Sequence, residues 1–437
     1  MKTICSLLAV VLAAPALVHA QGSLTPSGAP AASKKTLSQV EPRTDVLKLP
    51  GDGNNLYIIS SPGSYYLTTN VLGVLNKNGI SIASGNVTLD LNGFNVQGVP
   101  AGSIGSGVQV GGTYMNITVA NGTISGWPAS GLDGYSAGLP RNVVADRLNV
   151  SRNGASGIFM QADSVVHDCL SISNAGAGIY SAGGQILRCQ AHGNGLTGIQ
   201  AMHCSVRDSR AQDNGTSGFL LTQGSATDCQ SQGNGTTGFT IVSGSATGCQ
   251  SLNNSTNGYF ISNGSAENCY SANNLNGFFL NPATAVNCRS ESNSFGFYCN
   301  ASWSVVRGCT IANNNSYGIL FGGAGAALDN DITGIGTYGI YVYAGSQIIG
   351  NRLINADIGY PIYIVYGGNG SRVDNNTLVV LPGGVGIDIL GLTTNNIVTR
   401  NVVIGGGANN YLIPAGNDVG PIGTAATATS PWANISN

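Results

Sequence analysis

The sequence predicts an all-β fold, a parallel β-helix in which rungs of about 20 residues stack into a solenoid. The first observation is a cysteine that recurs at this spacing or a small multiple of it, at Cys169, Cys189, Cys229, Cys249, Cys269, Cys288 and Cys309. An asparagine follows each cysteine by five residues, and a glycine follows soon after, as in Asn234 and Gly238. A fixed period indicates one unit stacked on copies of itself, each burying the face that its neighbour exposes.

Side-chain character within one rung alternates as it does along a strand. Inward positions are small or apolar, at Ala226, Cys229, Ser231, Phe239 and Ile241, whereas outward positions are mostly polar, at Thr227, Gln230, Gln232 and Thr240. Three short strands per rung, with no helical period, are typical of a parallel β-helix. At Asn234 we expect a tight turn in the left-handed conformation and an amide bonded to its copies above and below. About fifteen such rungs fit the chain.

Composition divides the chain into five segments. Residues 1–20 predict a signal peptide, with Lys2 ahead of an apolar core and Val18-His19-Ala20 at its exit. Residues 21–46 are rich in Ser, Ala, Pro and Lys and predict a linker, and 47–79 predict an N-terminal cap over the open end of the solenoid. The β-helix is expected over 80–410 and a C-terminal tail rich in Pro, Ala and Thr over 411–437.

Two sequence stretches resemble a known family. The segments Gly63-Ser64-Tyr65-Tyr66-Leu67 and Val87-Thr88-Leu89-Asp90-Leu91-Asn92-Gly93-Phe94 resemble the opening of secreted bacterial right-handed parallel β-helix repeat proteins of the pectate-lyase-like superfamily, and Ser430-Pro431-Trp432-Ala433-Asn434 resembles their end. This resemblance implies polysaccharide lyases, glycosidases, uronate epimerases or non-catalytic surface proteins. The Asp-Asp pair and Gly-His-Gly of polygalacturonases are absent, as is a calcium-and-arginine pectate lyase motif, so no catalytic residue carries over.

Charge and hydropathy exclude several classes of protein. Only 8% of residues are charged, against about a quarter in typical domains, and the formal net charge is -2. Phosphate recognition needs a basic surface, so nucleic acid is excluded as a partner. After residue 20 no stretch reaches the roughly 20 apolar residues of a membrane span. We therefore expect a protein that is secreted, periplasmic or held at the cell surface.

The periodic cysteines are expected to be free thiols. Stacked strands lie about 4.8 Å apart, which keeps parallel Cβ atoms beyond the ~3.8 Å of a disulfide. Buried thiols then act as small hydrophobic groups. Cys204 and Cys299 fall outside the column, and their pairing is left open.

Outward polar departures from the repeat concentrate between Arg141 and Asp213. In register, His192 takes the position of Gln212, and Arg210 takes that of Gln190, so the two side chains are predicted neighbours on one sheet. Chemistry on a uronic acid needs a cation for the carboxylate and a base for the C5 proton, which arginine and histidine provide. The alternative is an ordinary solvated polar face.

A second polar column lies beside this one. Asp146, His167 and Arg207 share a register position, and His167 and Arg207 are further catalytic candidates. The adjacent position is charged as well, at Arg147, Asp168, Arg188, Asp208 and Asp228, so a pocket that uses both columns is possible. Asp208 and Asp228 follow one another in a column of otherwise alternating charge, where they are candidate ligands for Ca²⁺. Two carboxylates are few for such a hard cation, so an uncomplexed acidic pair is the alternative.

An outward aromatic stripe follows the repeat glycine. Its members are Phe260, Phe279, Tyr298, Leu320 and Tyr341, with Tyr343, Tyr363 and Tyr366 beside them. An exposed apolar stripe needs a partner, and three remain open: the C-terminal tail, a second copy of the chain, or a sugar stacked on the rings. Tyr298, Tyr341 and Tyr343 are the candidate sugar-binding residues, together with Gln190 and Gln212 near the polar site.

Two functions remain open. One is an enzyme that acts on an acidic, uronate-containing polysaccharide by lyase-type β-elimination or a related reaction. The other is a non-catalytic surface or matrix protein that binds glycans or self-associates, which the near-uniform rung length and low charge favour. Whether the chain is an enzyme is not decided by its sequence.

Overall fold

The computed structural model describes residues 42–99, 104–134, 139–161, 163–354 and 359–437. Two units divide the chain, residues 1–43 and 44–437, and the solenoid lies in the second. The predicted signal peptide (1–20) and most of the predicted linker (21–46) lie outside the described residues.

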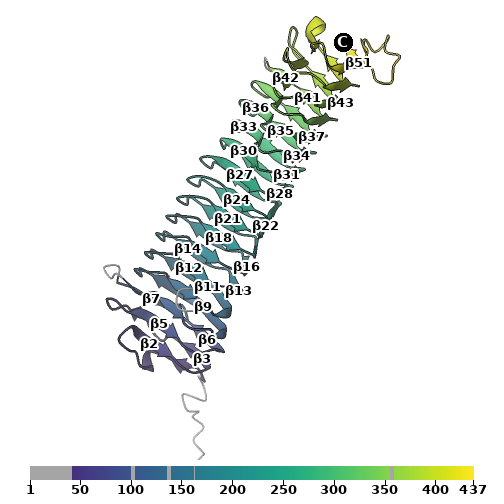
Figure 1. The fold of residues 1–437 in the computed structure, drawn as a ribbon. Coiled ribbons are helices and arrows are strands. Elements are labelled where there is room, and N and C mark those ends of the chain that lie inside the picture. The colour runs from purple at the N-terminus through teal and green to yellow at the C-terminus, as the bar shows by residue number, and fades with distance from the viewer. Residues whose placement is uncertain (1–41, 100–103, 135–138, 162, 355–358) are drawn as a thin grey trace, which may run out of the picture. The chain divides into compact units, whose positions relative to one another are not determined.

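Parallel strands stack along the solenoid in three columns, which we call faces 1, 2 and 3 (Figure 1). Face 1 consists of β2 (Asn55–Ile59), β5 (Asn78–Ile82), β8 (Val108–Val110), β10 (Leu132–Gly134), β12 (Ile158–Met160), β15 (Ile179–Ser181), β18 (Ile199–Met202), β21 (Phe219–Thr222), β24 (Phe239–Val242), β27 (Asn257–Ser262), β30 (Asn276–Leu280), β33 (Phe295–Cys299), β36 (Tyr317–Phe321), β39 (Tyr338–Val342), β42 (Tyr360–Ile364), β45 (Ile387–Ile389) and β48 (Tyr411–Leu412). Each strand pairs with the one before and after it in this order, as β21 does with β18 and β24.

Face 2 follows face 1 in every rung. It consists of β1 (Thr44–Asp45), β3 (Gly63–Tyr66), β6 (Val87–Asp90), β9 (Met115–Ser125), β11 (Arg141–Ser151), β13 (Ser164–His167), β16 (Gly184–Leu187), β19 (Cys204–Arg207), β22 (Ser225–Thr227), β25 (Ser245–Thr247), β28 (Gly264–Glu267), β31 (Ala283–Val286), β34 (Ser304–Arg307), β37 (Gly325–Leu328), β40 (Gln347–Ile349), β43 (Arg372–Asp374), β46 (Ile397–Thr399) and β49 (Asp418–Val419).

Face 3 completes the rung. It consists of β4 (Val71–Leu72), β7 (Asn95–Gln97), β14 (Leu170–Ile172), β17 (Gln190–His192), β20 (Arg210–Gln212), β23 (Gln230–Gln232), β26 (Gln250–Leu252), β29 (Tyr270–Ala272), β32 (Arg289–Glu291), β35 (Thr310–Ala312), β38 (Asp331–Thr333), β41 (Arg352–Ile354), β44 (Thr377–Val379), β47 (Val402–Ile404) and β51 (Asn434–Ser436), to which β50 (Ile422–Gly423) also pairs. The long strands β9 and β11 run through faces 2 and 3.

The predicted fold class is confirmed: the chain is a right-handed parallel β-solenoid with almost no helix. It has about 17 turns rather than fifteen, because segments expected to flank the solenoid also pair with it. In the predicted cap, β2 pairs with β5 and β3 with β6. In the predicted tail, β48 pairs with β45, β49 with β46 and β51 with β47.

The helical elements of the described residues are two short 3₁₀ helices, η1 (Val46–Lys48) and η2 (Gly407–Asn409). Neither these nor any other described segment forms a helix with the length and apolar character needed to cross a membrane.

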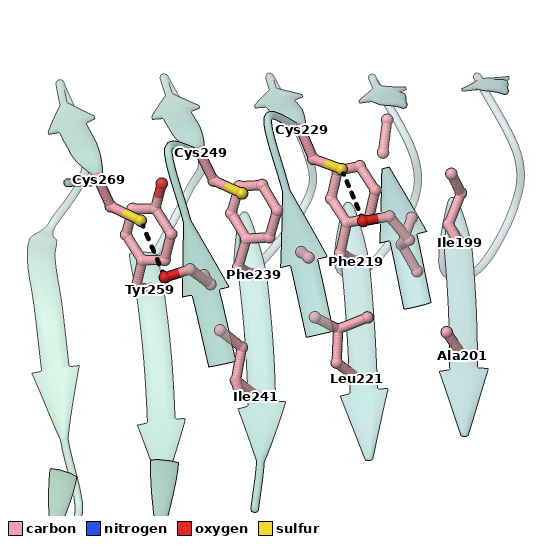
Figure 2. Packing of buried hydrophobic residues seen from close by; sticks show 14 of the residues in the cluster. Ile199, Ala201, Phe219, Leu221, Cys229, Phe239, Ile241, Cys249, Tyr259 and Cys269 are labelled. Atoms are coloured by element: carbon pink, nitrogen blue, oxygen red, sulfur yellow. Dashed lines mark hydrogen bonds between the residues drawn. The ribbon is translucent and has the colours of Figure 1, made fainter. Parts of the chain in front are cut away.

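The core is a set of ladders that run through the stack. Phe219, Phe239, Tyr259, Phe278 and Phe297 are fully buried on face 1 and stack in order, with ring centroids 4.6–5.0 Å apart. Figure 2 shows the sulfur atoms of Cys229, Cys249 and Cys269 pointing toward this ladder from the opposite side of the rung. The inward and outward positions predicted for the rung are confirmed, since Ala226, Ser231 and Ile241 are buried and Gln230 is exposed.

All nine cysteines of the described chain are buried and free, as predicted for the column. Cys204 and Cys299, whose pairing the sequence left open, are also free. Burial raises the pKa of both thiols, so neither is an activated nucleophile.

An asparagine ladder runs along one corner, also as predicted. The Nδ2 atom of Asn234 donates to Oδ1 of Asn254 at 2.9 Å, and the backbone N–H of Asn234 donates to the same oxygen. The expected left-handed conformation of Asn234 is wrong. The positive φ falls on the preceding residue, at 66° for Gly233 and 55° for Asn253, because the ladder residue must turn its amide inward while the corner residue points out.

Candidate functional site

The polar surface predicted between Arg141 and Asp213 is built on faces 2 and 3. His192 pairs in register with Gln212, and Gln190 with Arg210, as the repeat predicted. His192 and Arg210 therefore lie diagonally on the adjacent strands β17 and β20. Both side chains point outward, because Ala191 and Ala211 between them are buried.

His192 and Arg210 are not hydrogen-bonded to each other, and each side chain has another partner. The Nδ1 atom of His192 lies 3.6 Å from Oδ2 of Asp213, to which Gln212 Nε2 donates at 2.9 Å. The Nη2 atom of Arg210 donates to Gln232 Oε1 at 2.9 Å, on the following turn. About half of the His192 and Asp213 side chains is exposed. The arrangement is an open polar strip in which a histidine lies near a carboxylate.

The second polar column is less concentrated than its register suggested. His167 pairs with Leu187, which pairs with Arg207, so the two candidate residues lie two turns apart. Asp208 and Asp228 occupy consecutive corners with left-handed φ values of 50° and 53°. They place two carboxylates in the column beside that of His167 and Arg207.

A tighter cluster forms at the N-terminal side of this region. The Nδ1 atom of His167 lies 3.0 Å from Oδ2 of Asp168 and 3.2 Å from Oδ1 of Asp146. Arg188 donates twice to Asp168, from Nε and Nη2, each at 2.8 Å. The Arg188 guanidinium, helped by His167, holds the pKa of the Asp168 carboxyl well below its usual range. The register places Asp146 and His167 in one column and Asp168 in the adjacent one, and this cluster joins the two columns.

The predicted aromatic stripe forms a column on the outer side of face 1, but the expected exposure of Leu320 is wrong, because this side chain is buried among its neighbours. The residues of the stripe pair in register from β27 to β42, as Phe279 with Tyr298 and Tyr341 with Tyr363. Asp388 takes the next position on β45. Burial raises the pKa of the Asp388 carboxyl.

A second aromatic column runs beside the first and was missed. Phe295, Tyr317, Tyr338 and Tyr360 pair in register on β33, β36, β39 and β42. Neighbouring rings stack, with centroids 5.1, 5.2 and 5.7 Å apart along the column. The available sequence signal was an aromatic residue directly before the repeat glycine, as in Tyr317-Gly318 and Tyr338-Gly339.

We call the two columns together, with Tyr343 and Tyr366, the aromatic surface. Its rings contact one another across the columns, as Tyr338 and Tyr341 do at 4.8 Å. Tyr343 is 48% exposed, Tyr360 36% and Tyr366 59%. The predicted tail pairs with β45, β46 and β47 and continues the stack, so it leaves these rings open to solvent. Desolvation, chiefly, and neighbouring tyrosines raise the pKa of Tyr317 and Tyr341, so both hydroxyls keep their protons at neutral pH.

Comparison with protein families agrees with this architecture. A family model described as a right handed beta helix region matches residues 295–413. The matched segment is a right-handed β-helix region. The β-helix resemblance inferred from the opening and closing segments is confirmed. No curated protein sequence matches the chain.

Several solved structures are similar to this chain. The A-module of mannuronan C-5 epimerase AlgE4 from Azotobacter vinelandii is 15% identical over 77% of this chain and 91% of that one, with a TM-score of 0.35. A tailspike protein of E. coli bacteriophage HK620 in complex with a hexasaccharide is 12% identical over 91% and 78%, at 0.28. The catalytic domain of a GH87 α-1,3-glucanase in complex with tetrasaccharides is 14% identical over 66% and 63%, at 0.25. Similarity of this degree concerns the fold alone.

Proposed function

We propose that this chain is a glycan-binding β-helix protein that holds a sugar chain along its aromatic surface. The observation that carries the proposal is the double column of partly exposed rings on β33, β39 and β42, which Tyr317 continues on β36 beside the buried Leu320. Tyrosine joins an apolar ring, which packs on the C–H face of a sugar, to a hydroxyl that exchanges hydrogen bonds with it. The rings repeat at the strand spacing of about 4.8 Å and so form an extended row along which a linear polymer can lie.

The aromatic surface suits a glycan because each tyrosine adds a hydroxyl to its apolar ring. The protonated hydroxyls of Tyr317 and Tyr341 can exchange hydrogen bonds with sugar hydroxyls. Tyrosine is also enriched at protein interfaces, so the experiment below separates glycan binding from self-association. Asp388 at the end of the column supplies a further acceptor for sugar hydroxyls. We infer from the N-terminal segment that the protein meets this glycan outside the cytoplasm.

Affinity electrophoresis of the chain in gels containing neutral or acidic polysaccharides tests this function. We expect retardation by at least one polymer, and about tenfold weaker binding in a Tyr343→Ala, Tyr360→Ala double variant, since each ring contact contributes about 0.5–1.5 kcal/mol. Trp303→Ala, which removes an exposed aromatic residue elsewhere, should bind as the unmodified chain does. Equal loss in both variants, or a double variant that only changes the oligomer size in solution, would contradict glycan binding at this surface.

A second candidate is lyase-type chemistry on a uronate-containing polysaccharide. It is favoured by the His192 imidazole, which lies 3.6 Å from the Asp213 carboxylate and on the strand next to that of Arg210. In that reaction His192 would take the C5 proton while Arg210 neutralises the carboxylate, with Gln190 and Gln212 contacting the sugar. The C4–C5 double bond would form as the C4–O glycosidic bond breaks, and the leaving oxygen would take a proton from water. This candidate site lies on the exposed outer side of β17 and β20 and needs the polymer itself to exclude water.

The formation of unsaturated uronate, followed by its ultraviolet absorbance with and without Ca²⁺, tests the second candidate. Turnover that falls at least 100-fold in His192→Ala and in Arg210→Ala would support it, because a general base contributes about 10²–10⁴-fold. Gln250→Ala, at the same register position two turns further on, is the matched control. Absence of turnover on all polyuronates would leave glycan binding as the function.

A further inference from the structure

We propose that Asp146, His167 and Asp168 bind one divalent first-row transition-metal ion. Asp146 on β11 pairs in register with His167 on β13, and Asp168 directly follows His167 in the chain. The inference concerns a different surface from the aromatic one and does not depend on glycan binding.

The donor atoms have the spacing of ligands around a single ion. One nitrogen and two carboxylate oxygens all lie within 4.8 Å of one another. The His167 Nδ1 atom is 3.0 Å from an oxygen of Asp168 and 3.2 Å from an oxygen of Asp146. Two ligands at about 2.0–2.1 Å from a tetrahedral Zn²⁺ are separated by roughly 3.3 Å. An ion can therefore enter with small side-chain adjustments.

A buried carboxylate oxygen lacks a hydrogen-bond donor inside this cluster. Asp146 is 7% exposed, and its Oδ1 atom has no hydrogen-bond partner. The nearest nitrogen is Nδ1 of His167, but that atom carries one hydrogen at most, and its hydrogen bond is to Asp168. Leaving a buried acceptor unsatisfied costs about 1–3 kcal/mol, more when it is charged. A cation between the three donors would satisfy Asp146 Oδ1 directly.

The backbone and the flanking arginines hold the two carboxylates in place. Asp168 sits at a corner with a left-handed φ of 55°, and Arg188 binds both of its oxygens. Arg147 Nη2 lies 2.7 Å from the other oxygen of Asp146, which leaves Oδ1 directed at His167. Ligands fixed by such outer partners lose little freedom when a metal binds.

The same arginines do not fill the metal position. More than half of each guanidinium is exposed, so water screens its charge, whereas the Asp146 carboxylate is 10% exposed. Arg147 binds Oδ2 of Asp146, the oxygen away from His167, whereas Arg188 Nη2 shares Oδ2 of Asp168 with His167. A carboxylate oxygen has two lone pairs, so Asp168 Oδ2 can accept from Arg188 and still face an ion. The two aspartates therefore retain a lone pair each for an ion on the side of His167.

One imidazole and two carboxylates select a particular class of cation. Zn²⁺, Mn²⁺ and Co²⁺ accept mixed nitrogen and oxygen ligands, whereas Ca²⁺ takes six to eight oxygens. Three protein ligands leave the remaining positions to water or to an anionic group of a ligand. The proposal thus differs from the Ca²⁺ pair at Asp208 and Asp228 in both position and ion.

Titration calorimetry with ZnCl₂ after removal of metal by a chelator tests the site. We expect one equivalent bound by the unmodified chain, and binding at least about tenfold weaker in Asp146→Asn and in His167→Gln, the loss that even outer-shell partners of metal ligands cause. The paired variant His192→Gln, Asp213→Asn removes the other histidine–aspartate contact and should bind Zn²⁺ as the unmodified chain does.

A spectroscopic measurement distinguishes loss of metal binding from loss of the fold. Co²⁺ bound at this position should give visible absorption bands that disappear in His167→Gln, whose circular dichroism stays unchanged because the side chain is partly exposed. The proposal is overturned if the unmodified chain binds no Zn²⁺ or Co²⁺. It is also overturned if the His192, Asp213 variant loses as much affinity, or if Ca²⁺ binds more tightly and Asp208→Asn abolishes that binding.

Discussion

Corner residues of the solenoid adopt a left-handed backbone, and their identity follows from it. Most are Asn, Asp or Gly, which tolerate this conformation at little cost, as Asn253 and Gly233 do. Arg188 and Arg400 occupy the same kind of corner, at φ of 49° and 58°. Each binds a single carboxylate through two nitrogens, Arg188 that of Asp168 and Arg400 that of Asp374. The paired hydrogen bonds offset the strain of a long side chain at a corner.

Asp374 should make the stability of the chain depend on pH. Its carboxylate is 1% exposed and accepts hydrogen bonds from Arg400, Thr399 and Arg372. The Arg400 guanidinium leads in holding the pKa of Asp374 below its usual value, against the opposing effect of burial. A lowered folded-state pKa stabilises the fold above the unfolded value of about 3.9, and that stability is lost as pH falls through the folded-state pKa.

Asp374→Asn is therefore expected to lower the urea midpoint at pH 7 and to approach the unmodified chain at pH 2.5. Asp331→Asn removes an exposed pair with Arg352 and should change the free energy of unfolding by no more than about 1 kcal/mol at either pH. An Asp374→Asn chain that is destabilised equally at both pH values would show that its effect is not electrostatic.

At the scale of one rung, the strands and their two sides were predictable because the side-chain period of a strand is two. The repeat glycine was also predictable, but the reason that glycine is needed there lies in the contact between neighbouring turns. A Cβ atom on Gly238 would lie 1.9 Å from Ser251 Oγ and 2.6 Å from the carbonyl oxygen of Gly258, both on the next turn. The glycine is required because neighbouring turns approach closely there, and its φ is not positive.

Gly238→Ala is expected to destabilise the chain by about 1–3 kcal/mol, the cost of overpacking a filled site. Gly391→Ala is the matched control, since a Cβ there meets nothing within 4 Å and its φ is not in the left-handed region. Urea unfolding followed by circular dichroism measures both. Equal midpoints for the two variants would show that the close approach at Gly238 relaxes without cost.

At the scale of the whole solenoid, a second asparagine ladder closes the C-terminal end. From Asn330 onward the cysteine position is taken by a second asparagine ladder, and Asn401 donates to Oδ1 of Asn434 through its backbone N–H and Nδ2 at 3.0 and 3.1 Å. Asn434 thus accepts hydrogen bonds from two donors of Asn401 that would otherwise be unpaired at the end of the stack. An uncovered parallel edge is a template for pairing with another chain.

Deletion of residues 411–437 should therefore cause self-association. The truncated chain loses β48–β51 and exposes the edges of β45, β46 and β47. We expect a larger mass in light scattering coupled to size exclusion. Asn434→Ala keeps these strands and removes the ladder end, so it should lower stability while the chain keeps the mass of the unmodified protein. A truncated chain that stays monodisperse at the mass of a single shortened chain would refute this role of the C-terminal segment.

By itself the sequence determined the repeat, the inward and outward positions, the free thiols and the register of His192 with Gln212, because each of these follows from periods of two and about 20 residues. It did not determine which outward side chains meet. Arg210 turns to Gln232, Asp168 joins Asp146 and His167, and a second tyrosine column lines up beside the first. Rotamers and corner geometry decide such contacts, and these depend on neighbouring turns that a linear pattern does not contain.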